Sequence, residues 1–375
     1  MNKKIAVLSG DGIGPEIMME ALKVLRKIED IFGHKFETVE GLIGGSAREK
    51  YGEHFPKETV SIAENSDAIL FGSVGGPVDK QMEPKWRNCE TNSILAIRKH
   101  FNFNVNLRPV KLYSALKSSC VLRSDIVENG IDMLCVRELS QDVYFGKHET
   151  SGEVGMRHAF DEMSYDEKVI EAIAHAAFKA AMLRRKKVTS VDKANVLSCS
   201  KLWREVVTGV AKTYPDCILE HVLVDNMSMQ VIRRPGDFDV VLMPNMFGDI
   251  ISDEVSVFAG SLGMLPSASL NEKGFGLYEP SSGSAPDIAG KGIANPIGQI
   301  LSAAMMLKFS FGMNIEHDAI LGAVEKTLVD GLRTGDIADG GKSVSTSEMG
   351  AKIVENLNRF SLLTGVGARA SLGSP

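Results

Sequence analysis

Hydrophobic and polar residues near the start of the chain follow two successive patterns. A short apolar run at residues 5–8 leads into the glycine-rich stretch "SGDGIGPE". Apolar residues then recur every three or four positions, at Ile17, Ala21, Val24, Leu25 and Ile28. That spacing predicts a helix with one buried face, and Pro15 suits its first turn. We therefore expect a strand, a glycine loop and a helix in this order.

The same theme returns along the chain. "FETVE" predicts a second short strand, and "TVSIAENSDAILFGSVGGP" predicts a helix, a strand at 68–71 and another glycine loop. Longer extended segments follow, with a polar hairpin-like arm near 147–157, before strands and helices alternate again and a mostly helical last third begins. Alternating strands and helices indicate an α/β fold with a largely parallel sheet. Ligands of such sheets lie beyond the carboxyl ends of the strands, where both glycine loops are placed.

The length of 375 residues is sufficient for two domains. Because the extended middle interrupts the helix–strand pattern, we expect a discontinuous first domain of residues 1–103 and 259–375. Residues 104–258 form the second predicted domain. The sequence has no internal repeat and no low-complexity segment.

Composition restricts the classes of partner and compartment. The formal net charge is −6, which gives no general attraction to a nucleic-acid backbone, and the basic cluster at 184–187 suits the end of the helix before it. No apolar run approaches the roughly 20 residues that span a bilayer, and the first run is too short for a signal peptide. Five widely spaced cysteines without a CxxC pair indicate reduced thiols. We expect a cytoplasmic protein that binds neither membrane nor nucleic acid.

Two glycine-rich segments are candidates for binding a ligand. In "GDGIGPE" the glycines are spaced GxGxG, which is not the dinucleotide fingerprint, so a strand-to-helix turn is favoured. The segment 279–296, "EPSSGSAPDIAGKGIANP", is too long for a simple turn, and loops of this length are usually functional or disordered. Asp287 in this segment can accept hydrogen bonds from a ribose 2′-hydroxyl and would repel a 2′-phosphate.

Three aspartates come after the ends of apolar strands. Asp225 follows "HVLV", and Asp249 and Asp253 follow "VVLMP" four residues apart. On a helix, this spacing places both carboxylates on one face. Oxygen ligands without nearby His or Cys favour Mg²⁺ or Mn²⁺. A charge pair that complements the helix dipole explains Asp249 and Asp253 equally well at this point.

Five further polar residues have both a chemical and a structural interpretation. Arginine matches carboxylates in a bidentate manner, but Arg98, Arg108 and Arg137, taken singly, are more often surface ion pairs. Tyr144 is either a proton donor or half-buried packing. Lys193 lies just past a predicted strand, as either a general base or a solvated loop lysine.

Together these segments resemble the isocitrate/isopropylmalate dehydrogenase family of decarboxylating β-hydroxyacid dehydrogenases. The resemblance runs from "IAVLSGDGIGPE" to "STSEMG" and is carried by "SVGGP", "NLRP", "VRE…VYFG", "DKAN", "NMFGDIISDE" and "GSAPDIAGKGIANP". It implies a two-domain open α/β sheet fold that differs from the classical Rossmann fold, in agreement with the absent fingerprint. It also implies a homodimer whose active sites are shared between subunits.

The resemblance assigns expected roles residue by residue. Asp225, Asp249 and Asp253 match metal-binding aspartates, and Asp225 is contributed by the other subunit, where it also reaches the substrate. Arg98, Arg108 and Arg137 match arginines that bind substrate carboxylates. Tyr144 and Lys193 match the catalytic pair, with Lys193 also crossing the dimer interface. The residues that match the NAD loop are Gly283, Ser284, Ala285, Asp287, Ile288 and Asn295.

The substrate is expected from the segment before the first arginine. "NSILAIR" places the apolar residues Ile94 and Leu95 where isocitrate-specific relatives have polar residues. Branched apolar side chains suit an isopropyl group, so the resemblance implies NAD-dependent oxidative decarboxylation of 3-isopropylmalate to 4-methyl-2-oxopentanoate and CO₂, on the route to leucine. Mg²⁺ or Mn²⁺ is the expected metal. Asp287-Ile288 supplies no cation for a 2′-phosphate, which favours NAD over NADP.

Three residues depart from the family pattern, and three other functions stay open. Gln141-Asp142 stands where many relatives have two glycines, and Ser282 where some have a histidine near the adenine. A malate, tartrate or homoisocitrate dehydrogenase of the same family is the first alternative. A Mg²⁺-dependent phosphoryl-transfer enzyme is the second, although GxxxxGK[ST] is absent. A non-catalytic partner-binding relative is the third.

Overall fold

The computed structural model describes residues 1–364. Its contacts divide the chain into two compact units. Unit 1 consists of Met1–Phe101, Tyr113–Cys120 and the chain from Ala259 onward, and unit 2 consists of Asn102–Leu112 and Val121–Phe258. The segment Tyr113–Cys120 thus lies with unit 1, whereas the sequence-based boundaries place it in the second domain. The domain boundaries at residues 103/104 and 258/259 remain predictions from the sequence.

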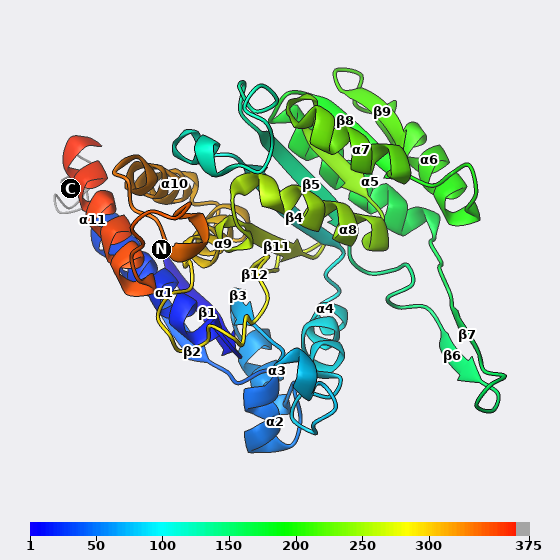
Figure 1. Cartoon of the computed structure of the whole chain (residues 1–375), viewed down its shortest axis with the longest axis horizontal. Helices are drawn as coiled ribbons and strands as arrows, with labels where there is room; N and C mark the ends of the chain where they lie inside the picture. Colours follow the sequence, from blue (N-terminus) through cyan, green and yellow to red (C-terminus); the bar gives the residue numbers. More distant parts are fainter. Residues whose placement is uncertain (365–375) are drawn as a thin grey trace. The chain divides into compact units, whose positions relative to one another are not determined.

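Unit 1 contains five strands in the order β2-β1-β3-β12-β11 (Figure 1). Strand β1 is parallel to β2 and to β3, β3 is parallel to β12, and β12 is antiparallel to β11. The apolar run of β1 is fully buried, as its sequence predicts. The bounds are β1 Asn2–Gly10, β2 Lys35–Glu40, β3 Ala68–Ser73, β11 Pro266–Leu270 and β12 Gly276–Pro280.

The helices of unit 1 surround this sheet. Helix α1 has its predicted buried stripe and a proline in its first turn, and it packs on α11 and α9. Helix α9 is apolar on all sides and almost wholly buried. The bounds are α1 Gly14–Phe32, α2 Gly45–Tyr51, α3 Lys57–Glu64, α4 Ala96–His100, α9 Ile297–Phe309, α10 Asn314–Val329 and α11 Thr346–Thr364. Thr91–Leu95 forms a π-helical turn before α4, and short 3₁₀ turns occupy Val78–Lys80, Ser114–Ser119, Leu262–Met264 and Gly335–Ile337.

Unit 2 contributes five further strands to a sheet, in the order β4-β5-β10-β8-β9. Strand β4 is antiparallel to β5, and the other neighbours pair in parallel. The strands are β4 Val105–Lys111, β5 Asp132–Glu138, β8 Lys187–Asp192, β9 Ile218–Leu223 and β10 Val240–Met243. The helices are α5 Glu167–Met182, α6 Ser198–Ala211, α7 Val224–Arg233 and α8 Asn245–Ser256, and 3₁₀ turns lie at Pro235–Asp237 and Val257–Ala259. The predicted α/β class with a mainly parallel sheet is confirmed.

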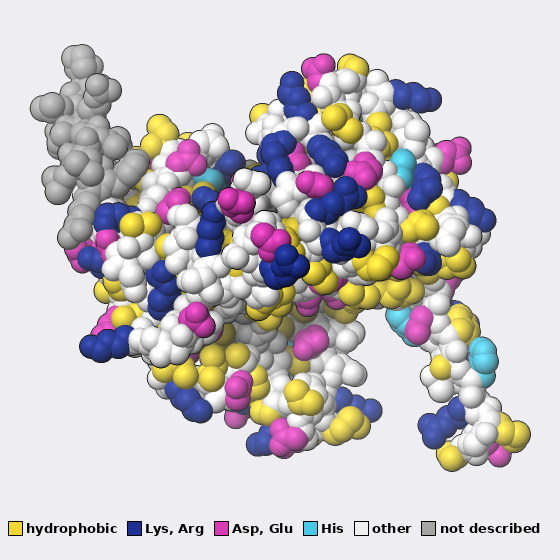
Figure 2. Space-filling model, turned by 45° about the horizontal axis from the view of Figure 1, so that its top comes forward, with side chains coloured by type: hydrophobic (Ala, Val, Ile, Leu, Met, Phe, Trp, Pro, Cys, Tyr) yellow, Lys and Arg dark blue, Asp and Glu magenta, His cyan; other side chains and the backbone are white. Residues whose placement is uncertain are grey.

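A two-stranded arm extends from unit 2 (Figure 1). Strands β6 His148–Ser151 and β7 His158–Asp161 pair antiparallel, and all their residues are exposed. This confirms the hairpin predicted near 147–157. Figure 2 shows apolar side chains at the tip of the arm, where Val154 is 84% and Met156 is 78% exposed. The arm buries little surface within its own chain.

The parallel strands of unit 2 bring three predicted site residues, together with Asn245, to one edge of its sheet. Arg137 lies near the end of β5, Lys193 follows β8, Asp225 follows β9 and Asn245 opens the helix after β10. Because these strands are parallel, their carboxyl ends share an edge, where ligands of open α/β sheets bind. Within residues 1–364, no helix has the length and apolar character to cross a membrane.

Candidate active site

Helix α8 presents two carboxylates toward two arginines. Asp249 Oδ1 accepts a hydrogen bond from Nη1 of Arg137, and Nη2 of Arg108 lies 3.8 Å from the same oxygen. Asp253 Oδ1 accepts from Nη1 of Arg108 at 3.1 Å. Burial raises the pKa of Asp253, and the charge of Arg108 opposes that shift. The four-residue spacing therefore places both carboxylates on one face of a helix, as the sequence predicts.

The arginines are held by fixed oxygen atoms as well as by carboxylates. Arg137 is only 2% exposed, and its Nε and Nη2 donate to Oδ1 of Asn245 at 3.0 and 2.7 Å. Arg108 donates from Nε to Asn106 Oδ1 and from Nη1 to Ser252 Oγ, each at 2.8 Å. The interpretation of Arg137 as a surface ion pair is wrong, because its guanidinium is buried within unit 2.

Tyr144 joins the same cluster. Its hydroxyl donates to Asp249 Oδ2 at 2.6 Å, and the guanidinium carbon of Arg137 lies 5.5 Å from the centre of its ring. Burial raises the pKa of Tyr144 to about 12, and the hydrogen bond to Asp249 and its negative charge add to the shift. The phenol therefore keeps its proton at neutral pH and is available as a proton donor.

Lys193 and Asp225 form a separate pair at the carboxyl ends of β8 and β9. Lys193 Nζ lies 2.6 Å from Asp225 Oδ1, and the side chains are 27% and 60% exposed. The hydrogen bond from Lys193 lowers the pKa of Asp225. The turn that carries the lysine is fixed by the buried Asp192, which accepts from Ala194 N at 2.9 Å and from Arg204 in a bidentate manner.

The donor set of α8 fits a hard divalent cation. Asp249 and Asp253 supply carboxylate oxygens without nitrogen or sulfur, which is the chemistry that Mg²⁺ and Mn²⁺ prefer. Two carboxylates leave most positions of an octahedral ion to water, to a substrate or to a further carboxylate. Within residues 1–364, no three His, Cys, Asp or Glu side chains gather closely enough to hold a metal ion. The three predicted metal ligands are therefore not united in one chain.

The remaining residues predicted to bind substrate lie in unit 1. Ile94 and Leu95 are half-buried in the π-helical turn before α4. Arg98 donates from Nη2 to Glu279 Oε1 at 3.0 Å, with both side chains nearly buried. The carboxylate of Glu279 on β12 thus holds Arg98 in place. The two side chains form a nearly buried ion pair within unit 1.

The predicted cofactor loop rests on the glycine-rich turn between β1 and α1. Ile13 N donates to Ser284 O at 2.9 Å. Gly12 has a φ of +60°, and a Cβ atom at this position would lie 1.9 Å from Ser284 O, so only glycine allows this approach. Ala285 and Ile288 pack against the small buried cluster that contains Ile13. The "GDGIGPE" segment is thus a strand-to-helix turn that supports the loop, as expected.

The rest of the loop offers both exposed and fixed groups. Gly283 and Asp287 are exposed, whereas Ser284 and Asn295 are buried. Asn295 donates to Asp336 Oδ2 at 3.1 Å and accepts from Ile297 N at 3.0 Å. The exposed carboxylate of Asp287 can therefore reach a ligand, while Asn295 fixes the end of the loop.

Comparison with known proteins decides the family. The family model described as isocitrate/isopropylmalate dehydrogenase matches residues 4–353. The chain belongs to the isocitrate/isopropylmalate dehydrogenase family. It is 56% identical over 352 residues to a protein named 3-isopropylmalate dehydrogenase from Haemophilus influenzae strain 86-028NP, covering 94% of this chain and 98% of the relative. A protein of the same name from Salmonella typhimurium strain LT2 is 53% identical, with 93% and 96% covered.

Solved structures of this family agree with the fold. An isocitrate dehydrogenase from Methylococcus capsulatus has a TM-score of 0.84 and 31% identity, covering 95% of this chain and 99% of that one. A β-decarboxylating dehydrogenase from Thermococcus kodakarensis has a TM-score of 0.76 and 34% identity, with 95% and 96% covered. The predicted isopropylmalate/isocitrate dehydrogenase type of fold is confirmed.

Sequence reasoning missed several residues that hold the predicted site residues within each unit. Asn245 aligns Arg137, Ser252 accepts from Arg108, and Glu279 holds Arg98. Asn245 and Ser252 lie within the motif "NMFGDIISDE", so their position in that segment was an available signal. Glu279 is the charged residue of the short strand β12, and a charge in a buried strand implies a partner.

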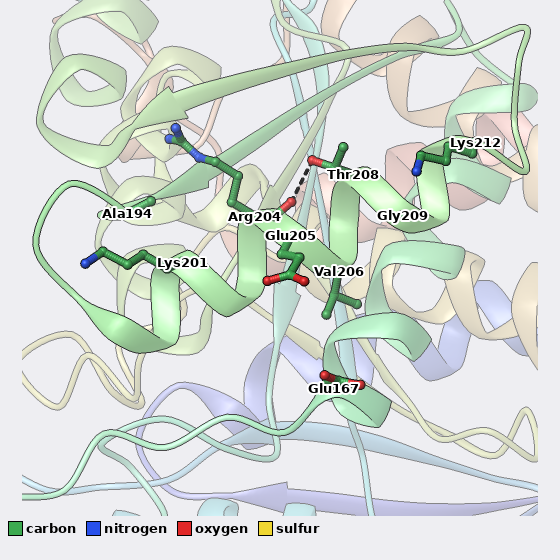
Figure 3. Close-up of a pocket in the computed structure, with 9 residues that line it drawn as sticks. All are labelled: Glu167, Ala194, Lys201, Arg204, Glu205, Val206, Thr208, Gly209 and Lys212. Carbon is green, nitrogen blue, oxygen red and sulfur yellow. Dashed lines mark hydrogen bonds between the residues drawn. The ribbon is translucent and has the colours of Figure 1, made fainter.

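A hollow on the outer side of α6 is not this site. It has a volume of about 750 Å³ and is lined by charges of both signs, including Lys201, Glu205 and Glu167. Figure 3 shows that Arg204 points toward Ala194, away from Glu167. Arg204 is already paired with Asp192, and none of the predicted site residues lines the hollow. We assign no role to it.

Proposed function

We propose that this family member is a 3-isopropylmalate dehydrogenase. It would oxidise and decarboxylate 3-isopropylmalate to 4-methyl-2-oxopentanoate and CO₂ with NAD, in leucine biosynthesis. The observation that carries the proposal is the contact between Tyr144 Oη and Asp249 Oδ2, since it unites the predicted proton donor with a predicted metal ligand. Relatives that bear this name at 53–56% identity support it.

Binding of the substrate rests on the arginines and on the apolar turn. Arg108 and Arg137 are aligned by fixed oxygen acceptors, so each presents a preorganised guanidinium to a carboxylate. Arg98 contributes from unit 1. Ile94 and Leu95 would contact the isopropyl group. Their apolar side chains offer no hydrogen bond, so they would disfavour a substrate with a polar substituent at this place.

Proton transfers are assigned to Lys193 and Tyr144. Asp225, Asp249 and Asp253 would hold Mg²⁺ or Mn²⁺, which would supply Lewis-acid polarisation at the C2 oxygen, and the loop of unit 1 would hold NAD, which would supply the hydride acceptor. Lys193, in its neutral form at the moment of reaction, would take the proton of the C2 hydroxyl. Tyr144 would deliver a proton to C3 after CO₂ leaves, because its phenol is protonated at neutral pH. Asp225 would also touch the substrate.

The complete site is proposed to require a homodimer. The Lys193–Asp225 pair and the cluster around Asp249 lie within one chain, but residues 1–364 hold no three-carboxylate metal site. A second copy can supply the missing pair to each cluster. Helices α7 and α8 pack together and expose Met229, Ile232 and Ile250 at 55%, 43% and 60%, an apolar surface that a second copy would cover.

The proposed cofactor and compartment are supported by the loop in unit 1 and by the cysteine thiols. The loop with Gly283, Ser284, Ala285, Asp287, Ile288 and Asn295 would bind NAD. The exposed carboxylate of Asp287 is suited to a ribose hydroxyl and repels a 2′-phosphate. All five cysteines are free thiols, which supports a reducing compartment, the cytoplasm.

A substrate comparison tests the function. We would measure kcat/KM for 3-isopropylmalate, malate and isocitrate, each with NAD⁺ and with NADP⁺, in the presence of Mn²⁺. The proposal expects preference for 3-isopropylmalate with NAD⁺. Leu95→Ser, which makes the proposed pocket polar, should lower kcat/KM for 3-isopropylmalate more than for malate. Preference for malate or isocitrate would refute the substrate, and preference for NADP⁺ would refute the cofactor.

A further inference from the structure

The first turn of helix α8 is capped by side chains that are distant in sequence. The residue before the helix is Pro244, and it provides no side-chain cap. The N–H groups of the first turn nevertheless need acceptors. Asn245 N donates to Tyr165 Oη at 2.8 Å, and Met246 N donates to Asp142 Oδ2 at 3.0 Å. Asp142 thus performs for α8 the function of an N-cap residue.

Asp142 occupies an unusual backbone conformation for a residue with a side chain. Its φ is +78°, in the left-handed region that favours glycine, and it is only 1% exposed. Such residues persist where the surroundings compensate the strain. Here Oδ1 accepts from Val143 N at 2.7 Å, and Oδ2 accepts from Met246 N and lies 3.1 Å from Tyr165 Oη.

Glu138 and Tyr165 extend this network. Tyr165 Oη also lies 3.2 Å from Glu138 Oε2, so its single proton can go to either carboxylate. Glu138 is fully buried and accepts from the backbone of Ser140 and of Gln141. We call Glu138, Asp142 and Tyr165 the carboxylate brace. It connects the segment after β5 with the beginning of α8.

We propose that Asp142 is a positioning residue that sets the placement of the metal-binding carboxylates relative to Tyr144. Asp142 precedes Tyr144 by two residues, and it caps the helix that carries Asp249 and Asp253. The contact between Tyr144 and Asp249 connects the same two segments a second time. Loss of the cap frees α8 to shift against the segment with Tyr144. This inference rests on the proposed function for its kinetic readout, but not for its binding readout.

Three variants test the brace. Asp142→Gly removes both the strain of the positive φ and the carboxylate. Asp142→Asn places a residue that also adopts this φ and keeps one acceptor oxygen. The matched control is Lys186→Gly, because Lys186 has a φ of +58°, is exposed and also lies in unit 2. Binding of Mn²⁺ alone to the full-length protein would be followed by the electron paramagnetic resonance signal of the free ion. Values of kcat and KM for 3-isopropylmalate are measured on the same samples.

The brace predicts a graded result. Mn²⁺ affinity should fall about 10–100-fold in Asp142→Gly, the range for residues that orient metal ligands, and less in Asp142→Asn. The value of kcat should fall with it, because Tyr144 loses its alignment, while Lys186→Gly leaves both unchanged. A merely structural role for Asp142 would change thermal stability alone, and unchanged Mn²⁺ affinity and kcat in Asp142→Gly would overturn the proposal.

Two further comparisons keep the test decisive. If Asp142→Gly does not fold, Tyr165→Phe takes its place, since it keeps the ring that packs on Trp203 at 5.5 Å and removes the shared hydroxyl. A loss of Mn²⁺ affinity in that variant supports the brace, and an unchanged affinity overturns it. A wild-type protein that binds Mn²⁺ without oxidising 3-isopropylmalate would refute the proposed function, while the Mn²⁺ series still decides the brace.

Discussion

Replacement of Gly248 by alanine should damage the active site although alanine is the better helix former. Gly248 lies in α8, one residue before Asp249. A Cβ atom at this position would lie 2.7 Å from Cγ and 3.0 Å from Cβ of Arg137. These atoms belong to the buried stem of the arginine, which cannot swing away into solvent. Either Arg137 or the helix has to move.

The expected free energies can be compared with those of a matched variant. Gly209→Ala lies in α6 of the same unit, at an exposed position where an added Cβ meets nothing within 4 Å. Both changes gain about 1 kcal/mol of helix propensity. Overpacking at residue 248 costs about 1–3 kcal/mol. Gly209→Ala should therefore be about 1 kcal/mol more stable than wild type, and Gly248→Ala about 0–2 kcal/mol less stable.

Urea unfolding and steady-state kinetics measure the two effects. The difference in unfolding free energy between the variants should be about 1–3 kcal/mol, because it isolates the contact with Arg137. A displacement of about 1 Å in Arg137 or Asp249 should lower kcat/KM about 100-fold, whereas Gly209→Ala keeps full activity. A Gly248→Ala protein that is as stable as Gly209→Ala and fully active would refute the assigned packing of Arg137.

Three other changes have defined outcomes. Asp249→Asn should weaken Mn²⁺ binding about 10–100-fold and raise KM for 3-isopropylmalate, and an unchanged metal dependence of the rate would speak against its role. Lys193→Ala should lower kcat by at least about 100-fold while Mn²⁺ affinity stays nearly constant, as expected when a general base is lost. Burial and the charge of Arg204 lower the pKa of His221, so stability present above about pH 6.5 should be lost as pH falls, because the unfolded imidazole takes a proton that the folded one resists. His221→Gln should make the urea midpoint less dependent on pH between about 7 and 5.5, and an equally steep dependence would argue against this cause.

Much of the fold could be predicted because the apolar runs that form strands end just before polar residues of the candidate site. Strand β10 ends two residues before Asn245, and β8 ends at the residue before Lys193. The four-residue spacing of Asp249 and Asp253 then sufficed to place both on one face of a helix. Local periodicity sets both features, so the sequence reveals them without tertiary information.

Other features depend on contacts between distant residues and left no local signal. Arg98 and Glu279 pair across 181 positions, and Asp142 caps a helix 104 positions away. The sequence shows Gln141-Asp142 only as a departure from the two glycines of many relatives. The φ of +78° and the helix cap give Asp142 a specific structural role that sequence reasoning did not anticipate. Strand β11, "PSASL", was missed because small residues replace the branched ones typical of strands.

The central claim is that one active site combines the cluster around Asp249 from one subunit with the Lys193–Asp225 pair from another. Mixing Lys193→Ala protein with Asp249→Asn protein tests it directly, after joint unfolding and refolding. About half of the dimers would then be mixed, and each mixed dimer would hold one intact site and one doubly impaired site, so about a quarter of wild-type activity should return. Activity no higher than that of the two separate variants, with mixed dimers present, would show that each site lies within a single chain.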